Sequence, residues 1–123
     1  HRNTARELAV RNSGLNLAID FIEWDASIDF NEFDLIVNTT PGETASIFVD
    51  QISKTSSTLF EVLYNPWPTT MLSKWRESGG YGIDGLDLLI HQAISQVEIF
   101  ASCSVDRMQV AKILRVVGEK ALA

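Results

Sequence analysis

Helical and strand patterns alternate along most of the chain, and this alternation constrains the fold more than any other feature. The apolar run at Asp34–Asn38 is typical of a strand buried on both faces, and Leu59–Tyr64 predicts the next strand. Helical patterns lie between and after these two runs. Because strands that alternate with helices form parallel sheets, the sequence predicts an open α/β fold.

Capping and helix-breaking residues mark where the predicted elements begin and end. Thr69 is expected to cap a helix that runs through Glu77, Gly79 and Gly80 to break it, and Asp84 to cap a helix that ends near Phe100. The other predicted elements are a helix from Ala5, a strand over 15–22, a helix over 43–53, a strand over 81–83 and a last helix from Ser104. The apolar stripes of the last two helices predict their packed faces: Leu86, Leu89, Ile90, Ala93, Val97 and Phe100, then Val110, Ile113, Leu114, Val117 and Ala121.

The composition argues against several classes of function. With 10 basic and 16 acidic residues among 123, the net charge of −6 disfavours general nucleic-acid binding. The apolar runs are too short to span a membrane. One cysteine and two histidines exclude a disulfide framework and argue against a Cys- or His-rich metal site. The acidic segment 20–34 is predicted to be a solvated loop with a short helix.

Residues able to bind a ligand gather where the predicted strands end. In open α/β sheets this is where ligands bind, so the residues are expected to line one cleft. Thr39 and Thr40 lie in a predicted turn, and Tyr64 lies in a stiff loop flanked by prolines. One row of a predicted helix adds Gly85, Leu88 and Gln92. Each has a simpler structural interpretation, as a strand-to-helix turn, a rigid loop or a packed helix face, and the residues alone leave these alternatives open.

Two further features bear on phosphate binding. Arg2 and Arg6 flank the start of the first predicted helix, where free N–H groups and guanidinium groups can bind a phosphate together. Taken by themselves, two solvated arginines are the favoured interpretation. Gly80, Gly82 and Gly85 have the spacing of a dinucleotide-binding loop, but a helix precedes them and not a strand. We therefore predict that they end a helix or allow close approach of the backbone, and do not bind a phosphate.

The ordered set of motifs resembles the C-terminal, NADP-binding half of shikimate dehydrogenases. The motifs are DLIVNTTPG at 34–42, VLYNPWPTTML at 62–72 and the most specific, DGLDLLIHQA, at 84–93. The resemblance implies a partial Rossmann-type parallel sheet flanked by helices, with C-terminal helices, lacking the first strand and the glycine-rich loop. Residues 1–100 would form the partial NADP-binding domain and 101–123 a C-terminal helix, and the sheet would keep an unpaired strand edge.

The resemblance also implies roles for single residues. Arg2, Asn3 and Arg6 match the stretch that grips the 2′-phosphate of NADP, and Tyr64 and Gln92 match positions that contact shikimate. The other positions implied beside the cofactor are Thr39, Thr40, the backbone of Val62, Gly85 and the side chain of Leu88. The family's catalytic Lys and Asp belong to its N-terminal domain, so no catalytic residue and no metal ligand is expected in this chain.

The function implied is that of an NADP-dependent shikimate dehydrogenase, a cytoplasmic oxidoreductase that reduces 3-dehydroshikimate to shikimate for aromatic amino-acid biosynthesis. The chain begins at His1 without a leader, so we expect a fragment that is inactive alone and needs the N-terminal half of the same protein. Neither nucleic acid nor membrane is an expected partner, and a homodimer stays open. The alternatives are a quinate/shikimate dehydrogenase that uses NAD, and a non-catalytic Rossmann-like binding module.

Overall fold

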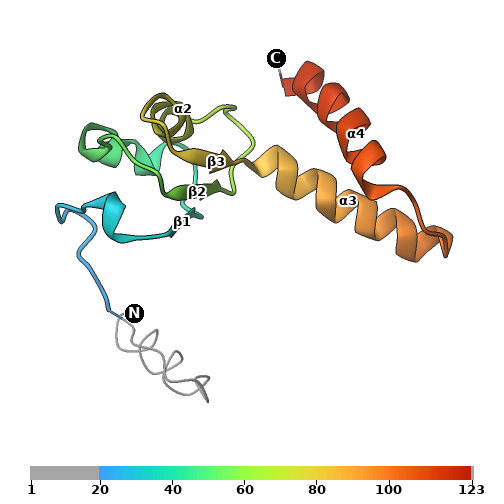
Figure 1. The fold of residues 1–123 in the computed structure, drawn as a ribbon, viewed down its shortest axis with the longest axis horizontal. Coiled ribbons are helices and arrows are strands. Elements are labelled where there is room, and N and C mark those ends of the chain that lie inside the picture. Colours follow the sequence, from blue (N-terminus) through green and yellow to red (C-terminus); the bar gives the residue numbers. More distant parts are fainter. Residues whose placement is uncertain (1–19, 123) are drawn as a thin grey trace.

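The computed structural model describes residues 20–122, which form a small parallel sheet, helices on one of its faces and a pair of long helices beyond its edge (Figure 1). The predictions for 1–19, including the first helix, the phosphate-binding arginines and most of the strand over 15–22, lie outside the described residues. The elements are η1 (Phe30–Glu32), β1 (Leu35–Asn38), η2 (Thr44–Gln51), β2 (Thr58–Glu61), α2 (Thr70–Glu77), β3 (Tyr81–Ile83), α3 (Gly85–Ala101) and α4 (Arg107–Leu122).

The three strands form one sheet in the order β1-β2-β3, and both pairings are parallel. Asn38 lies opposite Glu61, and Phe60 lies opposite Ile83. All three strands therefore end at the same edge of the sheet. This confirms the predicted α/β class and places the loops after β1, β2 and β3 beside one another.

One face of the sheet carries the core. Helices η2 and α2 cover this face, and Trp75 of α2 is fully buried against it, with its Nε1 donating to the backbone oxygen of Ser57 at 3.1 Å. Phe30 meets the Trp75 ring edge-on, with centroids 5.5 Å apart. The buried cluster consists of Phe30, Ala45, Phe48, Ile52, Leu59, Met71, Leu72 and Trp75.

The opposite face of β1 is open within the described residues, so the prediction of burial on both faces was wrong there. Leu35 and Val37 are 55% and 50% exposed, whereas Asn38 is buried. Side chains alternate between the two faces of a strand, and helices η2 and α2 cover only one of them. The run of apolar residues could not show which face would be covered.

Helices α3 and α4 pack along each other and extend away from the sheet (Figure 1). Their shared core has Leu86, Ile90 and Ile94 of α3 at its centre, with Val105, Val110, Ala111, Leu114 and Leu122 against them. The predicted stripes were therefore partly wrong. On α3, Val97 and Phe100 are 52% and 85% exposed, and on α4, Ile113 and Val117 are 57% and 59% exposed.

Most predicted helix ends are confirmed, because they depend on local hydrogen bonds. The Thr69 hydroxyl accepts from the Leu72 N–H, and the Asp84 carboxylate accepts from the Asp87 N–H. Gly79 ends α2 with a φ of 91°. The last helix starts later than expected, since its cap is Asp106, which accepts from the Gln109 N–H, and not Ser104.

Three other boundaries differ from the predictions. The helix predicted over 43–53 is the 3-10 helix η2, and the strand predicted from Leu59 to Tyr64 ends at Glu61. Residues 20–22 are not part of a strand, and the acidic segment 20–34 is the predicted loop with a short helix. Within residues 20–122, no helix is both long and apolar enough to cross a membrane.

Candidate cofactor and substrate site

The start of α3 lies directly against the backbone that follows β2. A Cβ atom built on Gly85 would lie 2.4 Å from the carbonyl oxygens of both Val62 and Leu63. Real Cβ atoms do not approach backbone this closely, so only glycine allows the helix to begin here. The two positions expected to border the nicotinamide, Val62 and Gly85, are therefore neighbours.

A buried carboxylate connects the loop after β1 to the loop after β2. Glu61 is fully buried, and its Oε2 accepts from Asn38 Nδ2 at 2.9 Å and from the Thr69 hydroxyl at 2.9 Å. Its Oε1 accepts from the Leu63 N–H at 3.2 Å. Asn38 Oδ1 in turn accepts from the Thr40 N–H at 3.1 Å and the Thr40 hydroxyl at 2.7 Å. The expected cofactor residue Thr40 is thus fixed relative to the end of β2.

Sequence reasoning did not single out Asn38, Glu61 or Thr69 as parts of this site. Asn38 and Glu61 are the last residues of β1 and β2, and a polar residue that ends an apolar strand run is a usable signal. Thr69 was expected only as a helix cap. Its hydroxyl does both tasks, because it accepts from Leu72 and donates to Glu61.

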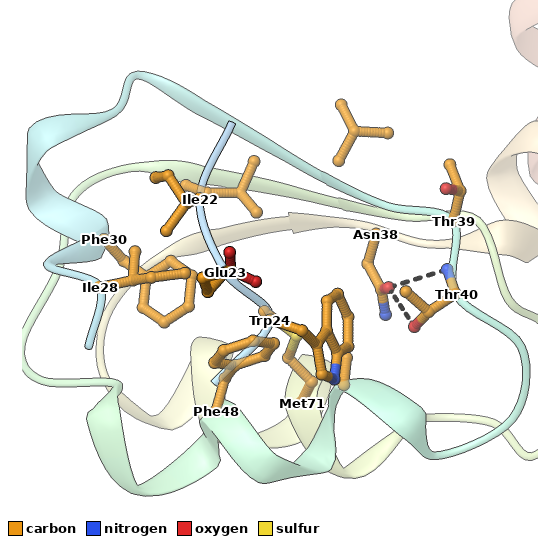
Figure 2. Close-up of a pocket in the computed structure, with 13 residues that line it drawn as sticks. Ile22, Glu23, Trp24, Ile28, Phe30, Asn38, Thr39, Thr40, Phe48 and Met71 are labelled. Atoms are coloured by element: carbon orange, nitrogen blue, oxygen red, sulfur yellow. Dashed lines mark hydrogen bonds between the residues drawn. The ribbon is translucent and has the colours of Figure 1, made fainter. Parts of the chain in front are cut away.

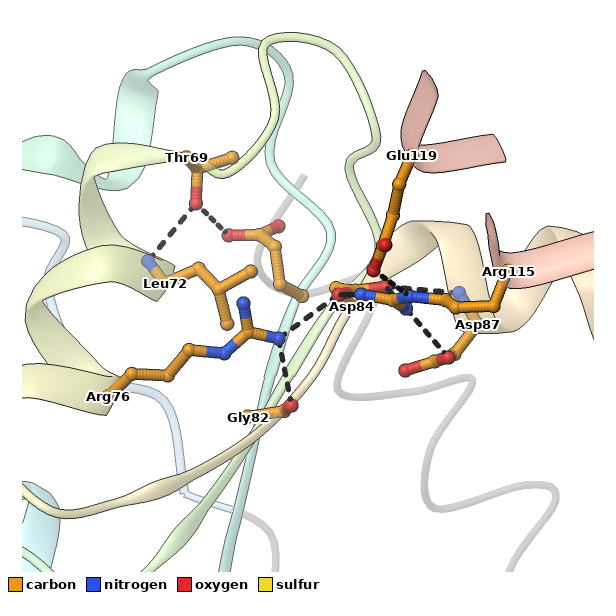
Figure 3. A network of polar contacts seen from close by, with 9 residues as sticks. Thr69, Leu72, Arg76, Gly82, Asp84, Asp87, Arg115 and Glu119 are labelled. Atoms are coloured by element: carbon orange, nitrogen blue, oxygen red, sulfur yellow. Dashed lines mark hydrogen bonds and ion pairs between the residues drawn. The ribbon is translucent and has the colours of Figure 1, made fainter. Parts of the chain in front are cut away.

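A second polar network surrounds Asp84 at the start of α3 (Figure 3). The Asp84 side chain is fully buried and meets Arg76 of α2 at 3.0 Å and Arg115 of α4 at 2.7 Å. Burial by itself raises the pKa of Asp84, but hydrogen bonds from Arg115, the Asp87 N–H and Arg76 outweigh it and lower the pKa to about 2. The same hydrogen bond to Asp84 raises the pKa of Arg115 further above its usual range.

Thr39 and Thr40 lie at one end of a largely apolar pocket of about 340 Å³ along β1 (Figure 2). Trp24 and Phe48 line the pocket, with their rings edge-on and 5.0 Å apart. The two threonines supply polar groups at the carboxyl end of β1, but the other residues expected to share a cleft with them do not line this pocket: Tyr64, Gly85, Leu88 and Gln92.

The remaining predicted site residues are open to solvent. Tyr64 is 47% exposed and Leu88 is 37% exposed, and the Gln92 side chain is also exposed. Gly85, Leu88 and Gln92 lie along one row of α3, which begins at the buried base of the site. Arg2, Asn3 and Arg6 lie outside the described residues.

The N–H of Thr70 connects helix α2 to the residue that precedes η2. Thr70 is the first residue of α2, and its N–H donates to the Glu43 carboxylate at 3.3 Å. A proline has no N–H to offer there. The contact between the N-cap of η2 and the first residue of α2 therefore requires a residue other than proline at position 70.

Comparison with known proteins agrees with this geometry. No model of a known protein family matches the chain. Two relatives called shikimate dehydrogenase (NADP(+)) do match. The one from Methanosphaera stadtmanae is 38% identical over an alignment of 92 residues, and the match covers 67% of this chain and 31% of the relative. The one from Bartonella quintana is 34% identical over an alignment of 100 residues, and the match covers 72% of this chain and 34% of the relative.

The structure of Mycobacterium tuberculosis shikimate dehydrogenase is similar as well, with a TM-score of 0.61 and 30% identity. The match covers 69% of this chain and 32% of that one. The chain belongs to the shikimate dehydrogenase family. This membership confirms the resemblance seen in the motifs and the Rossmann-like fold class. The chain spans about a third of the length of the family members that it matches.

Proposed function

We propose that the full-length protein is an NADP-dependent shikimate dehydrogenase that reduces 3-dehydroshikimate to shikimate. The observation that carries the proposal is the contact between Gly85 and the Val62–Leu63 backbone at the carboxyl edge of the sheet. The contact lies at the edge where open parallel sheets bind ligands. The relatives' names, which include NADP(+), support the same cofactor for this chain.

In this proposal the chain's own residues position the reactants. Bound NADPH supplies the hydride that is added to the carbonyl carbon of 3-dehydroshikimate. The backbone at Val62 and Gly85 and the side chain of Leu88 border the nicotinamide. Tyr64 and Gln92 face the substrate, where a hydroxyl and an amide can hydrogen-bond to a hydroxylated acid. The proton for the new hydroxyl comes from the family's catalytic residues, which belong to its N-terminal domain.

The same proposal assigns a role to each segment of the chain. Residues 1–100 form the partial NADP-binding domain, and 101–123 form a C-terminal helix that includes α4, which packs along α3. Arg2, Asn3 and Arg6 hold the 2′-phosphate, which favours NADP over NAD because that phosphate needs positive charge beside it. The free, exposed thiol of Cys103 suits a reducing compartment, and we place the protein in the cytoplasm.

The test is a steady-state assay of the full-length protein with shikimate or quinate and with NADP⁺ or NAD⁺. We expect the highest kcat/KM for shikimate with NADP⁺. Preference for quinate with NAD⁺ would favour the alternative dehydrogenase, and binding of NADP⁺ without any turnover would favour a non-catalytic module.

Two neighbouring leucines of α3 provide a matched pair of variants for this assay. Leu88 and Leu89 are 37% and 38% exposed, but they point in different directions around the helix. Leu88→Ala should lower kcat/KM for NADP⁺ several-fold, and Leu89→Ala should leave it nearly unchanged. Equal effects of the two substitutions would remove Leu88 from the nicotinamide site.

A further inference from the structure

Arg115 of α4 contacts both elements that carry the proposed substrate residues. Its Nη1 and Nη2 bind the two oxygens of Asp84, each at 2.7 Å, in a paired arrangement. Nη1 also binds Asp87 at 2.7 Å, and Nε binds Glu119 of its own helix at 2.8 Å (Figure 3). The guanidinium carbon lies 5.4 Å from the centre of the Trp67 ring. This distance is within the range of a cation–π interaction.

The residues that Arg115 contacts on α3 and in the loop lie within a few sequence positions of the proposed site residues. Asp84 immediately precedes Gly85, whose backbone lies against Val62 and Leu63. Asp84 and Asp87 bracket the first turn of α3, the helix that carries Gln92. Trp67 lies in the same proline-flanked loop as Tyr64. One side chain therefore joins the helix of Gln92 to the loop of Tyr64.

Few other polar contacts fix the Trp67 side chain within the described part of the chain. Its Nε1 is buried and has no hydrogen-bond partner there. The position of the indole then depends on packing and on the guanidinium that lies over its ring. Loss of Arg115 would free the loop on one side and the start of α3 on the other.

We propose that Arg115 is a positioning residue of the site, which holds the loop of Tyr64 and the first turn of α3 in the relative placement that substrate binding requires. The inference rests on the proposed function, and it extends the site to a helix whose sequence carries little of the family resemblance. Arginine suits this task because its planar group binds a carboxylate through two nitrogens while one face stacks on an aromatic ring. Lysine keeps the charge but offers neither the paired geometry nor the flat face.

The fold itself should survive the loss of Arg115. Asp84 keeps a second cation, Arg76, at 3.0 Å, and it keeps the Asp87 N–H. The apolar contacts between α3 and α4 do not involve the guanidinium group. Substitution should therefore loosen the site more than it unfolds the protein.

The same pair of helices offers a matched control. Arg107 of α4 binds Glu98 of α3 at 2.6 Å and the Ser95 hydroxyl at 2.7 Å, far along the pair from the sheet. Arg107→Met removes the ion pair with Glu98, and Arg115→Met removes those with Asp84, Asp87 and Glu119. Both variants keep an unbranched side chain. Only the second removes contacts to Asp84 and Trp67.

The experiment compares the full-length wild type with Arg115→Met, Arg115→Lys and Arg107→Met. We expect Arg115→Met to lower kcat/KM for shikimate by roughly tenfold or more, since small displacements in a site are costly, with the KM for NADP⁺ changed much less. The kcat/KM of Arg115→Lys should lie between those of Arg115→Met and the wild type, and the kcat/KM of Arg107→Met should resemble that of the wild type. Amide hydrogen exchange in 62–68 should become faster for Arg115→Met and stay unchanged for Arg107→Met.

Exchange and turnover separate the two proposals. If the wild type does not oxidise shikimate, the proposed function fails, while the exchange comparison still decides whether Arg115 holds the loop. If the wild type is active but Arg115→Met matches Arg107→Met in both kcat/KM and exchange, the positioning role is overturned. A lower Tm with unchanged KM and unchanged exchange in 62–68 would likewise overturn it, because it would show a merely structural ion pair.

Discussion

Asn38 donates its side-chain amide to both carboxylate oxygens of Glu61, at 3.1 and 2.9 Å, across the ends of two parallel strands. The orientation of the amide is fixed from its other side, since Asn38 Oδ1 accepts from Thr40. Glu61 is fully buried and accepts from neutral donors of Asn38, Leu63 and Thr69. The pair therefore sets the spacing between the two loops that border the proposed cofactor site.

Glu61→Gln should destabilise the protein by about 1–3 kcal/mol, because an amide nitrogen would face donors and leave buried groups unpaired. Urea unfolding of the full-length protein measures the change. Glu77→Gln, at an exposed carboxylate of α2, is the control and should have little effect. Equal stabilities of the two variants would show that the Glu61 charge is not needed.

The stability of the fold should depend on pH through Asp84. Its pKa is about 2 when folded and 3.8 ordinarily, so the folded form binds its proton less readily. The resulting stabilisation is fully present above the ordinary pKa and is lost as the pH falls through the range between the two values. The difference corresponds to about 2 kcal/mol.

The free energy of unfolding, measured for the wild type and Asp84→Asn between pH 6 and pH 2, isolates this contribution. The gap between the two proteins should shrink by about 2 kcal/mol as the medium becomes acidic. A gap that stays constant over the whole range would contradict the lowered pKa.

Gln92→Ala should raise the KM for shikimate by roughly tenfold, the effect of losing about one good hydrogen bond. The affinity for NADP⁺ should stay nearly unchanged. Gln96→Ala, at an exposed glutamine one turn further along α3, is the matched control. A KM that Gln92→Ala leaves unaltered would remove this residue from the substrate wall.

Joint substitution of Arg2 and Arg6 by alanine should weaken the binding of NADP⁺ much more than that of NAD⁺. The reason is that only NADP⁺ carries the 2′-phosphate that the two guanidinium groups are proposed to bind. Calorimetric titration of the full-length double variant with each cofactor measures both affinities. Equal losses for the two cofactors would refute the assignment.

Local signals predicted much of this fold. Thr69 and Asp84 act as helix caps as expected, Gly79 ends α2, and the short strand lies at 81–83 as predicted. Each of these features depends on residues only a few positions apart. The burial of β1 and the packed stripes of α3 and α4 depend on what packs from elsewhere, and here the predictions were partly wrong. The start of α4 also differs from the prediction, although a local cap, Asp106, sets it.

In the site, too, the sequence predicted some neighbours and missed the contacts between distant residues. The resemblance implied that Val62 and Gly85 lie near each other, and in the structure their backbones are neighbours. The contact of Asn38 with Glu61 joins residues 23 positions apart and depends on strand register. The contact of Asp84 with Arg115 spans 31 positions and needs the packing of two helices. No spacing rule connects such residues.

The distance along the chain between Asp84 and Arg115 also sets an order of events during synthesis. The sheet and the start of α3 leave the ribosome well before Arg115 does. Until Arg115 emerges, Arg76 is the only guanidinium partner that Asp84 has among the described residues. A premature stop codon just ahead of Arg115 would make that temporary state permanent. Such a truncation would then loosen the proposed substrate site, because Arg115 lies in the half of α4 that packs beside the first turn of α3.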